Sequence, residues 1–351
     1  MFIINLISFL VLITILVVIH ELGHFLAAKS IGLKVEKFYV GFNLFGLGVS
    51  KKIGETEFGI GLFPIGGYVK VAGMVDENFD DNYKGEEDEY INKGTIQKLW
   101  FTSGGVIFNF ILAFLLFSSL VYFDGLREPI PTINTTIEGM PASELDLIEG
   151  DKILRINDKI ILSWEMLSEN IRANPNQKIS IQWERKDHVL HDSILVSSRK
   201  LPSGDEIGVI GIEPKYEVQH LDLLGSLSFG FNQTTSWIKM MFSFIYSFFT
   251  GKLGIENFGG PIQIAKIAGE ASQVGILAFV NLMAILSINL GVINILPFPG
   301  LDGGHAMIAM IEGVLGKRIP FNVLIRIQTV GVILLAIFFF IVLKNDVLSL
   351  F

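Results

Sequence analysis

The sequence reads His20-Glu21-Leu22-Gly23-His24 directly after an uncharged apolar run from Phe2 to Ile19. The run predicts a helix, and residues four apart on a helix lie on the same face. His20 and His24 can therefore offer two imidazole nitrogens to one metal ion, with Glu21 close enough to reach a water molecule on that ion. Zinc accepts nitrogen and oxygen ligands, and its catalytic sites keep one position for water. The motif predicts a catalytic zinc site.

The apolar run places this motif inside a lipid bilayer or at its edge. About 18 residues at a rise of ~1.5 Å span roughly 27 Å, which is close to the hydrocarbon thickness. A charged side chain at that depth costs roughly 2.5–3.5 kcal/mol on insertion scales, so ionisable groups there usually have a function. A chance H-E-x-x-H, common in soluble helices, is the less favoured interpretation in this setting.

Composition supports a membrane protein. The 351 residues are 50% hydrophobic and only 18% charged, and the mean hydropathy is +0.53. The net charge of −8 argues against a nucleic-acid partner. The absence of cysteine excludes disulfides and cysteine zinc sites, so a metal must use histidine and carboxylate. The N-terminus lacks a positive n-region and a cleavage site before His20, which predicts a retained span.

We predict four spans, in a polytopic α-helical membrane protein. They lie in segments 1–28, 99–124, 274–316 and 321–344, the third of which also carries an Asp-Gly motif. The short run Ser236–Thr250, in segment 201–272, carries Lys239 and predicts an amphipathic helix at the outer surface.

Segment 29–98 predicts a membrane-associated β region followed by a solvated acidic loop at Asp76–Glu89. Phe58–Val71 has the pattern of short strands broken by glycines. Two interpretations stay open. The strands dip into the membrane and offer an edge to an extended peptide, or they form an ordinary hairpin packed on the helices.

Asp302 is the candidate third ligand. Pro297 and Pro299 break the third span, and Gly303-Gly304 allows a tight turn that presents a carboxylate at membrane depth. His305, close by, is expected to be structural or supporting. In the second span, Gly104-Gly105 predicts close helix packing. Asn109, four residues further on, is expected to combine packing with a secondary role near the metal helix.

The distribution of basic residues tests whether the site can form. Basic residues follow the first span, precede the second and link the last two: Lys29, Lys34, Lys37, Lys51, Lys52, Lys98, Lys317 and Arg318. By the positive-inside rule these segments are cytoplasmic. The N-terminus is then outside, and four spans bring both the histidines and Asp302 to the cytoplasmic side. A fifth crossing at Ser236–Thr250 would separate them by roughly a bilayer thickness, ~30 Å.

Segment 128–200 is charged and polar, unlike its flanks. It carries Gly139-Met140-Pro141-Ala142 and Gly150-Asp151-Lys152-Ile153-Leu154-Arg155-Ile156-Asn157, and it predicts a helix at Trp164–Ala173 and an alternating strand through Ile179, Ile181 and Trp183. The segment resembles a PDZ domain, inserted once and extracytoplasmic. PDZ domains bind extended peptides or C-termini by strand addition.

With both metal motifs in hand, the chain resembles the site-2 protease family of intramembrane zinc metalloproteases (peptidase family M50), of the bacterial regulator of sigma-E protease type. The matching pieces are His20–His24, Ile65–Lys70, Gly105 with Asn109, the single PDZ domain, Gly260-Pro261-Ile262 and Asn294–Gly304. Gly105-Val106 departs from the Gly-Pro that is frequent in the family.

The resemblance implies a zinc enzyme of the bacterial inner membrane that cuts single-span membrane proteins such as anti-sigma factors. Glu21 is then the general base, and His20, His24 and Asp302 are the ligands. It further implies that Asn294 holds substrate near the metal and that Gly59–Val71 pairs with the unwound substrate. We therefore expect substrate or oxyanion contacts from Asn294, Asn109, Gly59, Gly61, Gly66 and Gly67. The alternatives are a membrane metal-binding or transport protein with a PDZ scaffold and an inactive scaffold.

Overall fold

The computed structural model describes residues 2–43, 48–74, 86–200 and 206–348 of the 351-residue chain. Its packing divides the chain into two compact units. We call Met1–Phe123 with Asp222–Phe351 the helical unit and Asp124–Leu221 the inserted unit. Residues 76–85 of the predicted acidic loop Asp76–Glu89 lie outside the described residues.

Four helices of the helical unit, within the described part of the chain, are long and apolar enough to cross a membrane. They are α1 (Phe2–Ser30), α2 (Thr95–Asp124), α6 (Ile276–Asn294) and α8 (Phe321–Leu348). Only 11% of the most apolar window of α1 and 17% of that of α8 are buried inside the protein. Most of their apolar surface therefore needs lipid, and the predicted number of candidate spans is confirmed.

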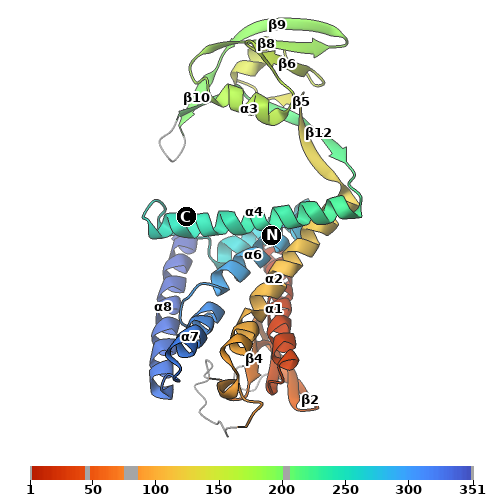
Figure 1. Ribbon diagram of the computed structural model, residues 1–351. Helices are drawn as coiled ribbons and strands as arrows, with labels where there is room; N and C mark the ends of the chain where they lie inside the picture. Colours follow the sequence, from red (N-terminus) through yellow and green to blue (C-terminus); the bar gives the residue numbers. More distant parts are fainter. Residues whose placement is uncertain (1, 44–47, 75–85, 201–205, 349–351) are drawn as a thin grey trace. The chain divides into compact units, whose positions relative to one another are not determined.

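Helix α4 (Leu223–Phe249) is not among these candidates. It runs crosswise to α1, α2 and α8 (Figure 1). Its buried positions Ser226, Gly230 and Thr234 are small, and a Cβ on Gly230 would lie 2.9 Å from the Phe114 carbonyl oxygen of α2. Small residues thus let α4 and α2 pack closely, and the helix begins well before the predicted Ser236.

Two shorter helices complete the helical unit: α5 (Pro261–Val274) and α7 (Asp302–Leu315). Helix α5 packs on the first half of α1, where Ala268 joins Leu12 and Leu16 in one buried cluster. The buried Asp346 of α8 accepts hydrogen bonds from three backbone N–H groups at the start of α5, those of Gly260, Ile262 and Gln263, at 2.9, 2.9 and 3.2 Å. A distant carboxylate thus caps this helix in place of a local side chain.

A four-stranded sheet lies between α1 and α2 in the chain. It contains β1 (Val35–Phe42), β2 (Gly48–Ile53), β3 (Thr56–Gly61) and β4 (Phe63–Val71), in the spatial order β2-β3-β1-β4. Strands β1 and β3 are parallel, and the other two pairs are antiparallel. Strand β4 is an edge strand among the residues described, and the predicted strands in Phe58–Val71 are confirmed.

The inserted unit is built on the sheet order β12-β5-β6-β8-β9. The strands are β5 (Leu126–Thr136), β6 (Lys152–Ile156), β8 (Lys178–Arg185), β9 (His188–Leu195) and β12 (Ile212–Gln219); β7 (Lys159–Ile160) pairs with β6, and β10 (Ser197–Lys200) pairs with β11 (Glu206–Val209). Helix α3 (Trp164–Arg172) starts at the cap Ser163, whose hydroxyl accepts from Met166 N–H.

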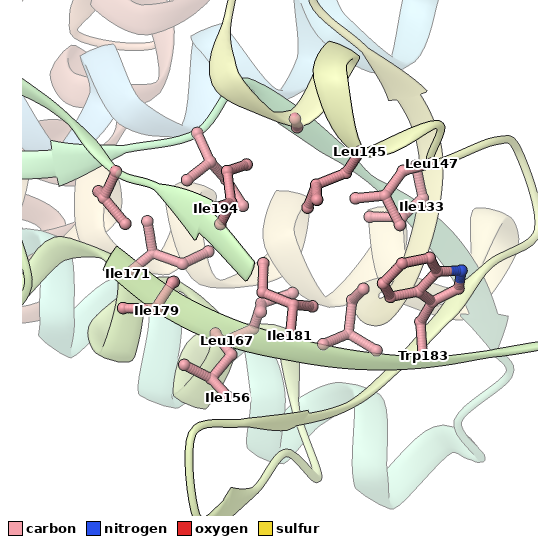
Figure 2. Close-up of a cluster of buried hydrophobic side chains, with 14 of the residues drawn as sticks. Ile133, Leu145, Leu147, Ile156, Leu167, Ile171, Ile179, Ile181, Trp183 and Ile194 are labelled. Carbon is pink, nitrogen blue, oxygen red and sulfur yellow. The ribbon is translucent and has the colours of Figure 1, made fainter. Parts of the chain in front are cut away.

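Figure 2 shows the core of this unit, where Leu167 and Ile171 of α3 meet Ile179, Ile181 and Trp183 of β8. The predicted helix and the alternating strand are confirmed, since every second residue of β8 points into this core. The unit is longer at both ends than the predicted 128–200 because β5 and β12 pair along their length. Because the inserted unit has its own hydrophobic core, it can fold as a separate domain between the helices of the helical unit in the sequence.

Candidate metal centre

Two histidines of the site lie one helical turn apart on α1. His20 and His24 are buried, with 7% and 6% of their surface exposed, and their Nε2 atoms lie 3.2 Å apart. The i, i+4 spacing places both rings on one helix face, as the sequence predicts. Two imidazoles so close, with both rings buried, are arranged to share one cation.

Asp302 joins them from a point 278 residues further along the chain. Its Oδ2 atom lies 3.2 Å from the Nε2 atoms of both His20 and His24. Asp302 is the first residue of α7. The two glycines after it allow the start of α7 to pack closely against the backbone of the preceding segment, residues 295–299. A Cβ on Gly303 would collide with the carbonyl oxygens of Ile295 and Leu296.

These three donor atoms, which we call the metal triad, fit a zinc ion. Their mutual distances are all 3.2 Å. Ligand atoms on a tetrahedral zinc at ~2.0–2.1 Å stand about 3.3–3.4 Å apart, nearly the spacing observed. Two imidazole nitrogens and one carboxylate oxygen also match the His₂–carboxylate sets of zinc hydrolases and leave one position open. The triad is the one group of this kind among the described residues.

Two polar groups on α2 contact the Nδ1 atoms of the imidazole rings, on the side away from the metal triad. His24 Nδ1 lies 2.9 Å from the Phe101 carbonyl oxygen, so Nδ1–H donates and Nε2 keeps its lone pair for the triad. The fully buried Asn109 amide lies 3.0 Å from His20 Nδ1. Among the described residues the Asn109 Oδ1 has no hydrogen-bond partner, and a half-turn of the amide lets it accept from Nδ1–H.

This position corrects the expectation that Asn109 contacts substrate or oxyanion. The residue touches the His20 nitrogen that faces away from Asp302, and it is fully buried. Asn109 can therefore orient the imidazole, as outer hydrogen-bond partners of metal ligands do, but it has no surface to offer a substrate. The spacing from Gly105 indicated that Asn109 faces α1, and it could not indicate which side of the ring it meets.

Glycines bring α2 within reach of the rings. A Cβ on Gly104 would lie 2.6 Å from the Gly23 carbonyl oxygen, so α1 and α2 touch backbone to backbone. A Cβ on Gly105 would lie 2.5 Å from both His20 Cε1 and His24 Nε2. The space that Gly105 leaves empty is the space that the two imidazoles occupy.

Gly105→Ala is therefore expected to displace the histidines and to empty the metal site. The added methyl overlaps both rings, which costs about 1–3 kcal/mol of stability for a packed core. Zinc content per protein and the thermal unfolding midpoint in detergent measure the two effects. Ser119→Ala, at an exposed position of the same helix, is the matched control. Normal zinc content in the Gly105 variant contradicts this account of the contact.

A cavity of about 230 Å³ opens in front of the triad. Glu21 of α1, Asn294 of α6 and the residues Gly67–Val69 of β4 line it together with the triad. The Asn294 Nδ2 atom lies 3.3 Å from His20 Nε2, beside the position that a bound ion would take. A Cβ on Gly67 would lie 3.2 Å from Glu21 Cγ, so β4 runs directly along the glutamate.

The four predicted glycines differ in position. Gly67 lines the cavity, and Gly66, with φ of +93°, sits at the irregular end of the β1–β4 pairing, where an L-residue would be strained. Gly59 and Gly61 lie on β3, which is paired with β1 on one side and β2 on the other. Both edges of β3 are thus occupied by neighbouring strands, which contradicts the expected pairing of Gly59 and Gly61 with substrate.

A tyrosine pair stiffens β4 where it passes the cavity. Tyr39 of β1 and Tyr68 of β4 stack with ring centroids 5.2 Å apart and planes 2° from parallel. The Tyr39 hydroxyl donates to Glu57 Oε1 at 2.5 Å, and this hydrogen bond lowers the pKa of Glu57. The anchored ring therefore fixes the neighbouring strand that lines the cavity.

Gln328 of α8 supports the loop before Asp302. Its Oε1 accepts from Gly300 N–H at 2.7 Å, and its side chain is buried. A polar residue in an apolar span was the signal that could have marked it. Phe101 acts through its backbone, so no pattern of side chains could have identified it.

The model of the family described as peptidase family M50 matches residues 8–338, nearly the whole chain. The chain belongs to peptidase family M50. A protein of Rickettsia conorii named a zinc metalloprotease is 32% identical over 99% of this chain and 99% of its own length. A similarly named protein of Clostridium acetobutylicum is 31% identical over 95% and 94%, and a protease of Enterococcus faecalis, eep, is 30% identical over 90% and 92%.

Membership of peptidase family M50 identifies the protein as a metalloprotease that uses zinc, and its apolar helices make it a membrane protein. Among solved structures, a PDZ domain of an SdrC-like protein from Listeria monocytogenes covers 25% of this chain at 18% identity. It is covered over 90% of its own length, with a TM-score of 0.22.

Proposed function

We propose that this M50 metalloprotease cuts peptide bonds within the membrane-spanning segments of single-span regulatory proteins of the anti-sigma-factor kind. The observation that carries the proposal is the metal triad itself, in which donors from apolar α1 and from the first residue of α7 stand 3.2 Å apart. Two of the ligands lie on a candidate span, and the third follows the end of another at Asn294, which favours a reaction at membrane depth. A metalloprotease that cuts soluble chains has no need of such a location.

His20, His24 and Asp302 hold the zinc ion in this proposal. Bound zinc supplies Lewis acidity, which activates a water molecule and stabilises negative charge on the scissile carbonyl oxygen. Phe101 and Asn109 keep the two imidazoles in the tautomer that leaves Nε2 unprotonated. Glu21, on the cavity wall beside His20, is the general base.

Glu21 takes a proton from the attacking water onto its carboxylate and passes it to the nitrogen of the leaving amide. Asn294, whose amide nitrogen lies beside the triad, donates a hydrogen bond to the substrate carbonyl. Strand β4, the outermost strand on its side of the sheet among the described residues, offers backbone hydrogen bonds to a substrate segment that has unwound. These bonds offset the helical hydrogen bonds that the substrate loses, which in lipid cost several kcal/mol each.

The proposed setting is the bacterial inner membrane. Basic residues near the ends of the candidate spans favour a cytoplasmic position for the active site and an outside position for the N-terminus. The inserted unit is then outside, where its sheet and its helix α3 suit a PDZ domain that binds a peptide or a C-terminus. The strand region β1–β4 enters the membrane face only where its backbone is paired.

A cleavage assay on a single-span reporter tests this function. The purified protein in lipid nanodiscs is expected to cut the reporter within its apolar segment, to lose this activity with a chelator and to regain it with added zinc. A membrane metal transporter, the competing function, would bind zinc and leave the reporter intact. Products cut outside the apolar segment would contradict intramembrane cleavage.

A further inference from the structure

A second cavity, of about 360 Å³, adjoins the one in front of the metal triad. Met74, His305 and Gln328 line both cavities, so the two spaces meet at these three side chains. The residues of the second cavity belong to the helical unit, and neither the metal ligands nor Glu21 are among them. The chemistry of hydrolysis therefore leaves this space unused.

Strand β4 passes along both cavities. Gly67, Tyr68 and Val69 line the first, and Lys70 and Val71 line the second. At ~3.3 Å per residue, roughly 13 Å of strand separates Gly67 from Val71. An extended chain that pairs with β4 and has its scissile bond at the triad would therefore reach the second cavity two to four residues away from that bond.

The walls of the second cavity are largely apolar. Helix α7 contributes Ile308 and Ala309, and α8 contributes Phe321 and Leu324. Ala309 is the smallest of these side chains and is almost fully buried, at 1% exposed. The space in front of it suits a large apolar side chain.

Two of the basic side chains at the second cavity form ion pairs, and the third donates to an uncharged group. Lys70 forms an ion pair with Glu36 at 3.7 Å, and Lys98 forms a buried one with Glu312 at 2.8 Å. Arg318, at the exposed turn between α7 and α8, donates instead to the uncharged Asn92 Oδ1 at 3.1 Å. Within the part of the chain that the structure describes, Arg318 forms no ion pair, so its guanidinium can bind the carboxylate of an incoming chain.

We propose that this second cavity is a specificity subsite for the substrate chain. It holds one large apolar side chain that lies two to four residues from the scissile bond, and Arg318 favours an acidic residue next to that side chain. The proposal rests on the proposed function, because it needs a substrate paired with β4. Its occupant is the substrate itself, since the same strand continues from one cavity into the other.

Reporters that differ at one position test the subsite. Each of the four positions on either side of the scissile bond carries Ala or Leu in turn. We expect the wild-type protein to cut the Leu reporter about tenfold faster than the Ala reporter at one position two to four residues from the bond, because a buried side chain of that size discriminates by this order. The side on which the effect appears gives the direction of the substrate relative to β4.

Two variants change the cavity in opposite ways. Ala309→Phe fills it and is expected to abolish the preference for Leu at that position. Leu324→Ala enlarges it and is expected to shift the preference towards Phe. Ile311→Phe, at a 41% exposed position of α7, is the matched control and should keep the wild-type preference. Arg318→Glu is expected to reverse the preference between Asp and Lys at the adjoining position.

The possible outcomes distinguish a failure of the subsite proposal from a failure of the proposed proteolytic function. Zinc content and unfolding midpoint show whether each variant is folded. Wild-type preferences in both Ala309→Phe and Leu324→Ala, in folded proteins, would overturn the subsite. Cleavage that needs Glu21 but shows no preference at any position would overturn the subsite alone. A wild-type protein that cuts none of the reporters would overturn the proposed function instead.

Discussion

Glu21→Gln is expected to keep zinc and to cut the single-span reporter about 10²–10⁴ times more slowly than the wild-type protein. Glutamine has nearly the same shape as glutamate, so the packing against Gly67 is retained. The amide cannot accept the water proton, and a positioned general base contributes typically 10²–10⁴-fold. Glu21 is not a member of the metal triad, so the ligand set is unchanged.

Zinc content by atomic absorption and single-turnover cleavage in nanodiscs measure the two parts of this result. Glu270→Gln makes the same chemical change at an exposed position of α5 and should behave as the wild type. A Glu21→Gln protein that cuts at a rate near that of the wild type would remove Glu21 from the role of base. Loss of zinc from it would instead make Glu21 part of the ion's binding site.

Asp302→Asn is expected to weaken zinc binding at least about 100-fold and to abolish cleavage. The variant keeps the shape of the side chain and removes the negative charge that faces two imidazole nitrogens at 3.2 Å. Loss of an outer partner of a ligand already costs 10–100-fold in metal affinity, and the ligand itself should cost more. Because Glu21 and the β4 edge are untouched, the variant separates metal binding from substrate binding.

Competition with a fluorescent zinc chelator measures this affinity. Asp158→Asn, at an exposed turn of the inserted unit, is the control. The Asp302 variant should still be captured by the same substrate reporter in a pull-down assay. An Asp302→Asn protein with the zinc affinity of the wild type would exclude Asp302 as a ligand.

The candidate site was predictable where metal chemistry imposes a local pattern. The four-residue step from His20 to His24 is set by helix geometry, and the break at Pro297–Gly304 marks a carboxylate brought to membrane depth. The positive-inside rule then placed both halves at one depth, and the structure brings them together. The roles of these residues in metal binding and in the reaction stay predictions.

The strand order of the sheet and the hydrogen bonds that orient the two imidazole rings could not be predicted from local sequence patterns. The order β2-β3-β1-β4 places β3 inside the sheet, and no local pattern distinguishes an edge strand from an inner one when both are apolar and glycine-rich. This is why Gly59 and Gly61 were grouped with Gly67. The hydrogen bond from His24 to the Phe101 carbonyl oxygen depends on how α1 crosses α2, which is a tertiary property.

The separation of 278 residues between His24 and Asp302 has a consequence for biosynthesis. At roughly 5–20 residues per second, a ribosome needs about 14–56 s to add Asp302 after it has added His24. Throughout that interval the nascent chain holds two imidazoles without their carboxylate. With the proposed ligand set, a chain truncated before Asp302 lacks the third metal ligand, so unfinished molecules are expected to be unable to cleave neighbouring proteins.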